Sequence, residues 1–175
     1  DTVQVNGSVA ANDVFVVGAG VGGRVAFNRT SPGPFSLDIG STETLTAARI
    51  GGDDSFSVNS LVGVASLTSV NLAGLAGNDT FNVVPAPIGV TVTATGHTPS
   101  FPSSPGDTLS LDLTGVTLPV ATPDGGQPAL AGAFSSTNRG DVNYRGIDDL
   151  VANAPYGLGI NANADPAPGA QMNDG

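Results

Sequence analysis

The sequence predicts an all-β protein, and three features of the chain lead to this class. Short runs of β-branched or alternating apolar residues recur along most of the chain, in most cases about 9 to 14 residues apart. Gly, Pro, Asn, Asp, Ser and Thr interrupt every stretch before three helical turns could form. A short Asp-containing motif precedes several of the runs. We therefore expect a β-solenoid of the β-helix kind, with a β-sandwich as the alternative.

The expected strands follow one another from the first residues to Tyr144. Each run carries Val, Ile, Phe, Tyr, Thr or Leu, with turn-forming residues between the runs, which is typical of short strands. The runs are 2–5, 14–17, 24–27, 35–39, 56–58, 67–72, 81–84, 90–94, 109–113, 116–120 and 142–144. Only residues 150–154 indicate a helical turn.

A repeated motif favours the solenoid over the sandwich. It reads small or Asn/Asp, then Asp, then alternating apolar residues, and it occurs as NDVFVV at 12–17, DDSFSV at 53–58, NDTFNV at 78–83 and GDTLSL at 106–111. The steps between its second positions are 41, 25 and 28 residues. A step near 25 residues is about one coil of a three-sided parallel β-helix. At a corner of such a coil, Asp can cap the backbone N–H groups of the turn.

The chain divides into a β-rich repeat domain over 1–152 and a linker or extended arm over 153–175. The arm is rich in Asn, Ala, Gly and Pro and poor in large apolar residues. Because the sequence starts with Asp and not Met, we expect an excised or mature piece of a longer secreted protein.

Composition excludes several classes of chemistry. The chain has no Cys and no Lys, which excludes disulfides, thiolate metal sites and lysine-based catalysis. Its net charge of −10 and its scattered Arg residues argue against a nucleic-acid partner. No apolar run is long enough for a membrane span. The single histidine, His97, is not accompanied by a GxSxG motif, which argues against a Ser-His-Asp triad. Glu43 is the only Glu, which argues against a glycosidase with paired carboxylates. We therefore expect no enzyme activity.

Two strings carry a resemblance to a known family. GLAGNDTFN at 74–82 and RIGGDDSFS at 49–57 resemble degenerate calcium-binding repeats of the RTX, or haemolysin, type. Gly74, Gly77, Asp79 and Phe81 match the family pattern in the first string. Gly52, Asp54 and Phe56 match it in the second. The resemblance implies Ca²⁺ bound by oxygen ligands of the repeats. The predicted ligands are Asp53, Asp54, Asn78, Asp79 and Asp107, and turn capping is the alternative role for the aspartates.

The wider pattern is similar to long secreted bacterial surface proteins with many such repeats. This resemblance implies a β-rich structural or adhesive role and no reaction. The repeats, the turn aspartates and the shortage of candidate catalytic groups favour the same non-catalytic module at the cell surface, with Ca²⁺ stiffening. Because strand edges are templates for strand addition, we expect self-association through strand edges or the termini. A module that binds carbohydrate or protein is the first alternative, with a surface polysaccharide as the partner. A polysaccharide-degrading β-helix enzyme is the second alternative.

Overall fold

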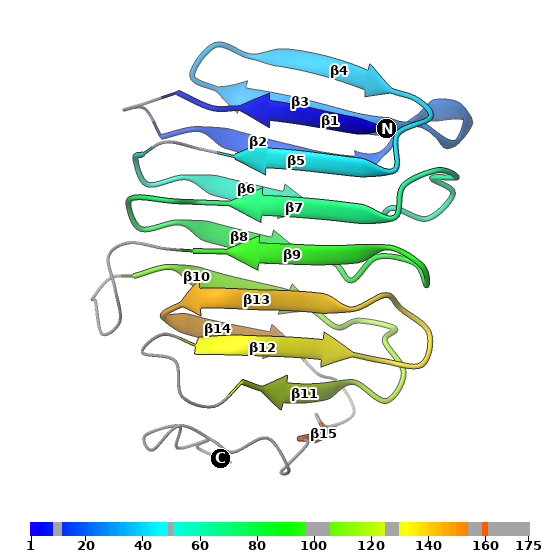
Figure 1. Cartoon of the computed structure of the whole chain (residues 1–175), viewed down its shortest axis with the longest axis vertical. Coiled ribbons are helices and arrows are strands. Elements are labelled where there is room, and N and C mark those ends of the chain that lie inside the picture. The colour runs from blue at the N-terminus through cyan, green and yellow to red at the C-terminus, as the bar shows by residue number, and fades with distance from the viewer. Residues whose placement is uncertain (9–11, 49–50, 97–105, 125–129, 154–158, 161–175) are drawn as a thin grey trace.

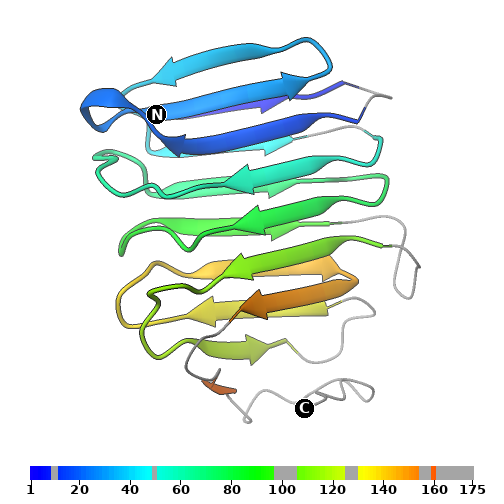
Figure 2. The ribbon, with the colours of Figure 1, turned by 180° about the vertical axis from the view of Figure 1, so that it is seen from behind.

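The computed structural model describes residues 1–8, 12–48, 51–96, 106–124, 130–153 and 159–160, and this part of the chain is all-β apart from one short 3₁₀ turn. The predicted all-β class is therefore confirmed. Figure 1 shows two layers of strands that lie across the long axis of the molecule, and Figure 2 shows the same layers from behind. The strands are β1 (Thr2–Asn6), β2 (Val14–Ala19), β3 (Val25–Ser31), β4 (Phe35–Ile39), β5 (Thr44–Ala48), β6 (Ser55–Val58), β7 (Ser69–Ala73), β8 (Thr80–Val83), β9 (Thr91–Thr95), β10 (Thr108–Asp112), β11 (Val120–Pro123), β12 (Leu130–Ser135), β13 (Val142–Ile147), β14 (Asp149–Asn153) and β15 (Gly159–Ile160).

The strands form two mixed sheets. The front sheet of Figure 1 has the order β1-β5-β7-β9-β13-β12-β11-β15, and the back sheet has the order β14-β10-β8-β6-β2-β3-β4. Five times along the chain, a strand of the front sheet is followed by a strand of the back sheet, and we call two such consecutive strands a strand pair. These pairs are β1–β2, β5–β6, β7–β8, β9–β10 and β13–β14. Within each sheet the strands of successive pairs are hydrogen-bonded in parallel.

Two antiparallel insertions extend the sheets at opposite ends of the molecule. After β2, the chain adds β3 and β4 to the back sheet before it returns to the front sheet as β5. After β10, it adds β11 and β12 to the front sheet before β13. The two motif steps of 41 residues, Asp13 to Asp54 and Asp107 to Asp148, each contain one insertion.

Alternating residues of both sheets meet in one hydrophobic core. Large aromatic side chains line the inner face of the back sheet. Small aliphatic residues such as Ala47 and Ala94 lie on the inner face of the front sheet. Ring contacts join Phe35, Phe27, Phe15, Phe56 and Phe81 in a continuous column, with centroid distances from 5.0 to 6.1 Å. The back-sheet register then continues this column through Leu109 to Leu150. Combining large and small residues fills such an interior at the density that proteins require.

Several sequence-based expectations need correction. The step from Asp54 to Asp79 contains two strands, β6 and β7, so the third strand of a three-sided coil is absent between these residues. Residues 150–154 were expected to form a helical turn, but Asp149–Asn153 is strand β14, because Asp107 and the parallel ladder to β10 hold it extended. The strand expected at 116–120 begins only at Val120, since Val116 closes a turn by donating its N–H to the carbonyl of Leu113.

Some strands were not expected from the sequence, and most of the predicted arm lies outside the described residues. Strands β5, β12, β14 and β15 had no counterpart among the expected strands. Within the predicted arm, Asn153 ends β14, and Gly159–Ile160 pairs in parallel with β11. His97 and residues 154–158 and 161–175 lie outside the described residues.

Candidate functional site

Aspartates of the repeated motif form a column that runs through the turns before the back-sheet strands. We call Asp13, Asp54, Asp79, Asp107 and Asp148 the inner column. The backbone N–H of Asp13 donates to Oδ1 of Asp54 at 2.8 Å, and that of Asp54 donates to Oδ1 of Asp79 at 2.9 Å. The series continues from Asp79 to Asp107 and from Asp107 to Asp148, at 2.8 Å each. Every strand pair is therefore tied to the next by a carboxylate that caps its turn.

Four of the five inner-column aspartates are buried and Asp148 is half-buried, which makes the hydrogen bonds of the column costly to remove. Asp13, Asp79 and Asp107 are 0% exposed and Asp54 is 2% exposed. A buried polar group without a hydrogen bond costs about 1–3 kcal/mol, and a charged group costs more. At the end of the column nearest β3, the guanidinium of Arg29 forms an ion pair with Asp13. Ser8 donates to Oδ2 of Asp13 from both its backbone N–H and its hydroxyl.

A second column lies one residue earlier in the chain and is exposed to solvent. We call Asn12, Asp53 and Asn78 the outer column. The N–H of Asp53 donates to Oδ1 of Asn12 at 3.1 Å, and the N–H of Asn78 donates to Oδ1 of Asp53 at 2.9 Å. Donation in the outer column runs toward the preceding motif, whereas in the inner column it runs toward the following one. Each motif in the middle is thus held to both of its neighbours.

Two glycines are required by the close approach of neighbouring turns. A Cβ atom on Gly74 would lie 2.1 Å from Oδ2 of Asp79, and a Cβ on Gly77 would lie 2.1 Å from the carbonyl oxygen of Gly52. Gly77 also has φ of 130°, which disfavours any residue with a side chain. Spacing of Gly and Asp in GLAGND therefore has a steric explanation that involves no ligand.

The five predicted metal ligands are divided between the two columns. Asp54, Asp79 and Asp107 belong to the inner column, and Asp53 and Asn78 belong to the outer column. The side chains of the four predicted aspartates each accept a hydrogen bond from a backbone N–H of a neighbouring turn. This is turn capping, the alternative role considered from the sequence. Among the residues that the structure describes, no three His, Cys, Asp or Glu side chains are grouped so that they could hold a metal ion. Calcium binding stays a prediction.

The ends of the inner column were missed in the choice of site residues. Asp13 belongs to the motif NDVFVV, and its equivalence to Asp54 was visible in the sequence. Asp148 was harder to find, because it follows Asp107 by 41 residues and its string, IDDLVAN, starts with Ile. The signal for Asp148 was the equal length of the two steps that carry an insertion.

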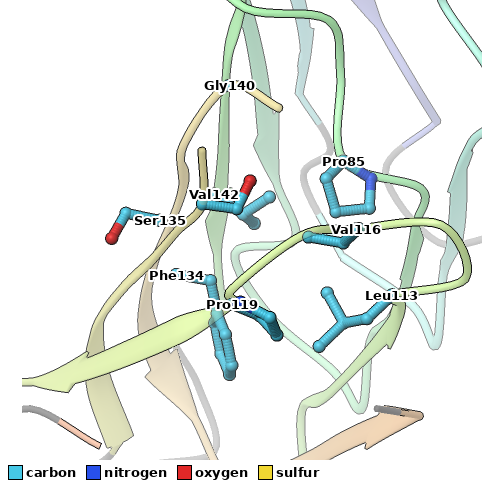
Figure 3. A pocket seen from close by; sticks show the side chains of 9 residues that line it. Pro85, Leu113, Val116, Pro119, Phe134, Ser135, Gly140 and Val142 are labelled. Atoms are coloured by element: carbon cyan, nitrogen blue, oxygen red, sulfur yellow. The ribbon is translucent and has the colours of Figure 1, made fainter. Parts of the chain in front are cut away.

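The part of the chain that the structure describes has a small, partly open hollow and a wider groove. The hollow lies between Pro85, Leu113, Val116, Phe134 and Val142, and Figure 3 shows these apolar side chains converging on it. Its volume of about 10 Å³ is no larger than one water molecule requires. Such a space cannot admit a substrate.

The groove lies on the outer face of the back sheet, over β6, β8, β10 and β14. It has a volume of about 340 Å³, and it is lined both by polar residues such as Asn82 and Asp112 and by apolar residues such as Val84 and Val151. The hydroxyl and backbone N–H of Thr114 donate to Asp112 and lower the pKa of that carboxyl. Short amide and hydroxyl groups at regular strand spacing could bind a polar ligand.

Comparison with known proteins adds no relative. No protein-family model, curated protein or solved structure matches this chain. In the described residues no helix is long and apolar enough to cross a membrane.

Proposed function

We propose that the chain is a β-solenoid that serves as a non-catalytic extracellular building block, with a structural or adhesive role. The observation that carries this proposal is the inner column, in which one carboxylate per strand pair caps the turn of its neighbour. A repeated local bond of this kind stabilises a stack in which each unit contacts only its neighbours. The buried aspartates of the motif bind neighbouring turns, and the small hollow beside Phe134 and Val142 has too little volume for a substrate.

Immunogold labelling of the source cells tests the extracellular role. An antibody against the purified chain should label a layer, fibre or matrix outside the cell. Labelling confined to the cell interior would contradict the proposal. Cells that lack the gene provide the control for antibody specificity.

Thermal unfolding tests whether the columns act as turn caps or as calcium sites. A ligand that binds only the folded chain raises the midpoint of unfolding. With caps alone, millimolar Ca²⁺ and excess chelator give the same midpoint. A midpoint that rises with Ca²⁺ in the intact chain, but not in Asp53→Asn, would assign Asp53 to a metal site. Mg²⁺ at the same concentration controls for a general effect of divalent ions.

The groove favours polysaccharide binding as a second candidate function. Its polar lining repeats from strand to strand, as Asn82 on β8 and Ser110 on β10 lie side by side in register. Pull-down with insoluble polysaccharide from the source surface should capture the intact chain and lose the Asn82→Ala/Ser110→Ala variant. Thr46→Ala, on the outer face of the front sheet, is the matched control. Equal capture of all three proteins would exclude the groove as the binding site.

A further inference from the structure

The two ends of the molecule have complementary outlines. At one end the back sheet continues past β2 with β3 and β4, while the front sheet stops at β1. At the other end the front sheet continues past β13 with β12, β11 and the short β15, while the back sheet stops at β14. Figures 1 and 2 show these extensions at the top and bottom of the stack. Each end therefore has a projecting sheet on the side where the other end is cut short. The back-sheet projection is two strands wide, so β12 and β11 fit beside it, whereas the two-residue β15 would have to leave its place next to β11.

From this outline we infer that a second copy of the chain stacks head to tail on the first, with β4 of one copy beside β14 of the other. This inference rests on the proposed building-block function and specifies its contact. Within the described residues, no strand pairs with the outer edge of β4 or of β14. Free strand edges are the usual sites for strand addition, and a contact between two different surfaces repeats without closing.

Strand direction permits the contact. Strand β4 is antiparallel to β3, and β3 is antiparallel to β2, so β4 runs in the same direction as β2. Strand β14 is linked to β2 through an unbroken series of parallel pairs. A copy displaced along the stack without being turned over thus brings β4 to β14 in parallel, the pairing that the back sheet already uses.

The side-chain register also fits across the contact. Phe35 is level with Phe15 through Arg29, and Phe15 is level with Leu150 through the back-sheet ladder. In register, Phe35 of the second copy would lie beside Leu150 and extend the core column into the next molecule. Asp38 would lie beside Asn153, so the contact places no two carboxylates opposite each other. Asp38 is also neutralised by Arg24 within its own copy.

The end with β4 exposes apolar surface that the contact would cover. Central strands such as β5, β7 and β9 alternate buried and half-buried residues, but in β4 only Ile39 is buried. Phe35 and Leu37, on the same face as Ile39, are 37% and 38% exposed. Both face the side on which the front sheet has ended. Covering this face with the projecting β11 and β12 of another copy would complete the sandwich of side chains at the joint.

Disulfide trapping tests the contact directly, because the chain has no cysteine of its own. Ser36 and Val151 occupy outward positions that would be neighbours in the proposed register. Adjacent strands hold paired Cα atoms within the range a disulfide spans. A mixture of S36C and V151C chains should form mixed dimers under mild oxidation, and the double variant should form a ladder of oligomers.

The controls separate this arrangement from others. S36C chains alone should form no disulfide-linked dimers, and a mixture of S36C with Q4C should not cross-link, because β1 and β4 lie at the same end. Disulfide dimers of S36C alone would overturn the proposal in favour of a head-to-head contact. Absence of mixed dimers at any protein concentration would overturn it too, and would indicate that another segment covers these edges.

A substitution at the contact measures its strength. Leu37→Asp should weaken association about tenfold or more, because it puts a charge in the apolar patch, while the monomer keeps its unfolding midpoint within a few degrees. Association should increase with salt, since each copy carries a net charge of −10. Extracellular labelling without cross-linking would refute the contact alone. Cross-linking with labelling only inside the cell would refute the proposed extracellular role alone.

Discussion

The central strand pairs β5–β6, β7–β8 and β9–β10 differ from the two ends of the molecule in how their strands are connected. In the centre, each strand pairs in parallel with a strand of the next pair, and the inner column links every turn. At the ends, antiparallel insertions replace this pattern, and the column stops at Asp13 and Asp148. The difference indicates that the motif specifies stacking, whereas the insertions specify how a stack ends.

The largest contrast between centre and end should appear on truncating the aromatic column. Phe56→Ala removes a fully buried ring from the centre and should cost about 3–5 kcal/mol of unfolding free energy. Phe35→Ala, at the end of the column and 37% exposed, should cost about 1 kcal/mol. Urea unfolding of both variants checks the difference. Equal losses would mean that the β3–β4 end is as tightly packed as the centre.

Crowding at the central turns gives the next largest effect. Gly74→Ala should cost about 3 kcal/mol, because the new methyl group would displace the Asp79 carboxylate that accepts from Asp54. Gly18→Ala is the matched control, since its Cβ meets only Cβ of Asn59, at 3.5 Å. Thermal unfolding should separate the two variants by several degrees. An Ala at position 74 that leaves the midpoint unchanged would show that the turn has room to relax.

Neighbouring aspartates of one motif distinguish the inner from the outer column. Asp54→Ala leaves the buried N–H of Asp13 without its acceptor and should cost about 2–3 kcal/mol. Asp53→Ala removes a similar bond to Asn78, but in solvent, and should cost less than about 1 kcal/mol. The denaturation midpoints of the two variants, measured with excess chelator, provide the comparison. A larger loss for Asp53→Ala would contradict the assignment of the columns.

The smallest expected effect concerns pH at the β12–β13 end. Burial raises the pKa of Tyr144 above its ordinary value of 10.0. Between 10.0 and the raised value, the unfolded chain has lost the phenolic proton and the folded chain has kept it, so stability falls as pH rises through this window. Absorbance titration of Tyr156→Phe, which leaves Tyr144 as the only tyrosine in a chain without Trp, measures this pKa. Titration at the ordinary value would mean that Tyr144 is solvated.

Strands with a local signal in the sequence could be predicted from it. Motifs such as DDSFSV and NDTFNV show the turn, the inward Phe and the outward Ser or Asn within a few residues. Capping by Asp was one of the roles that the motif itself suggested. Strand β4 was also found with its full bounds, since FSLDI alternates cleanly between turn residues.

Other strands, in the centre and at the ends, could not be predicted in the same way, because their structure depends on distant partners. Strand β5, TLTAA, and strand β12, LAGAFS, contain Ala or Gly, which have low strand propensity, and the sheet on either side holds them extended. The sequence of strand β14 resembles a helical turn, and its extended conformation depends on the parallel hydrogen-bonded ladder to β10. The division of one motif into a buried and an exposed column also needs the neighbouring turns, since Asp53 and Asp54 are adjacent and chemically identical.

Amide hydrogen exchange with excess chelator tests the central claim most directly, that the inner column ties the strand pairs together without metal. The backbone N–H groups of Asp13, Asp54 and Asp79 donate to buried carboxylates, so they should exchange only as fast as the whole domain unfolds. The N–H groups of Asp53 and Asn78, in the exposed outer column, should exchange faster. Exchange of the inner amides at the rate of exposed turns would contradict the claim.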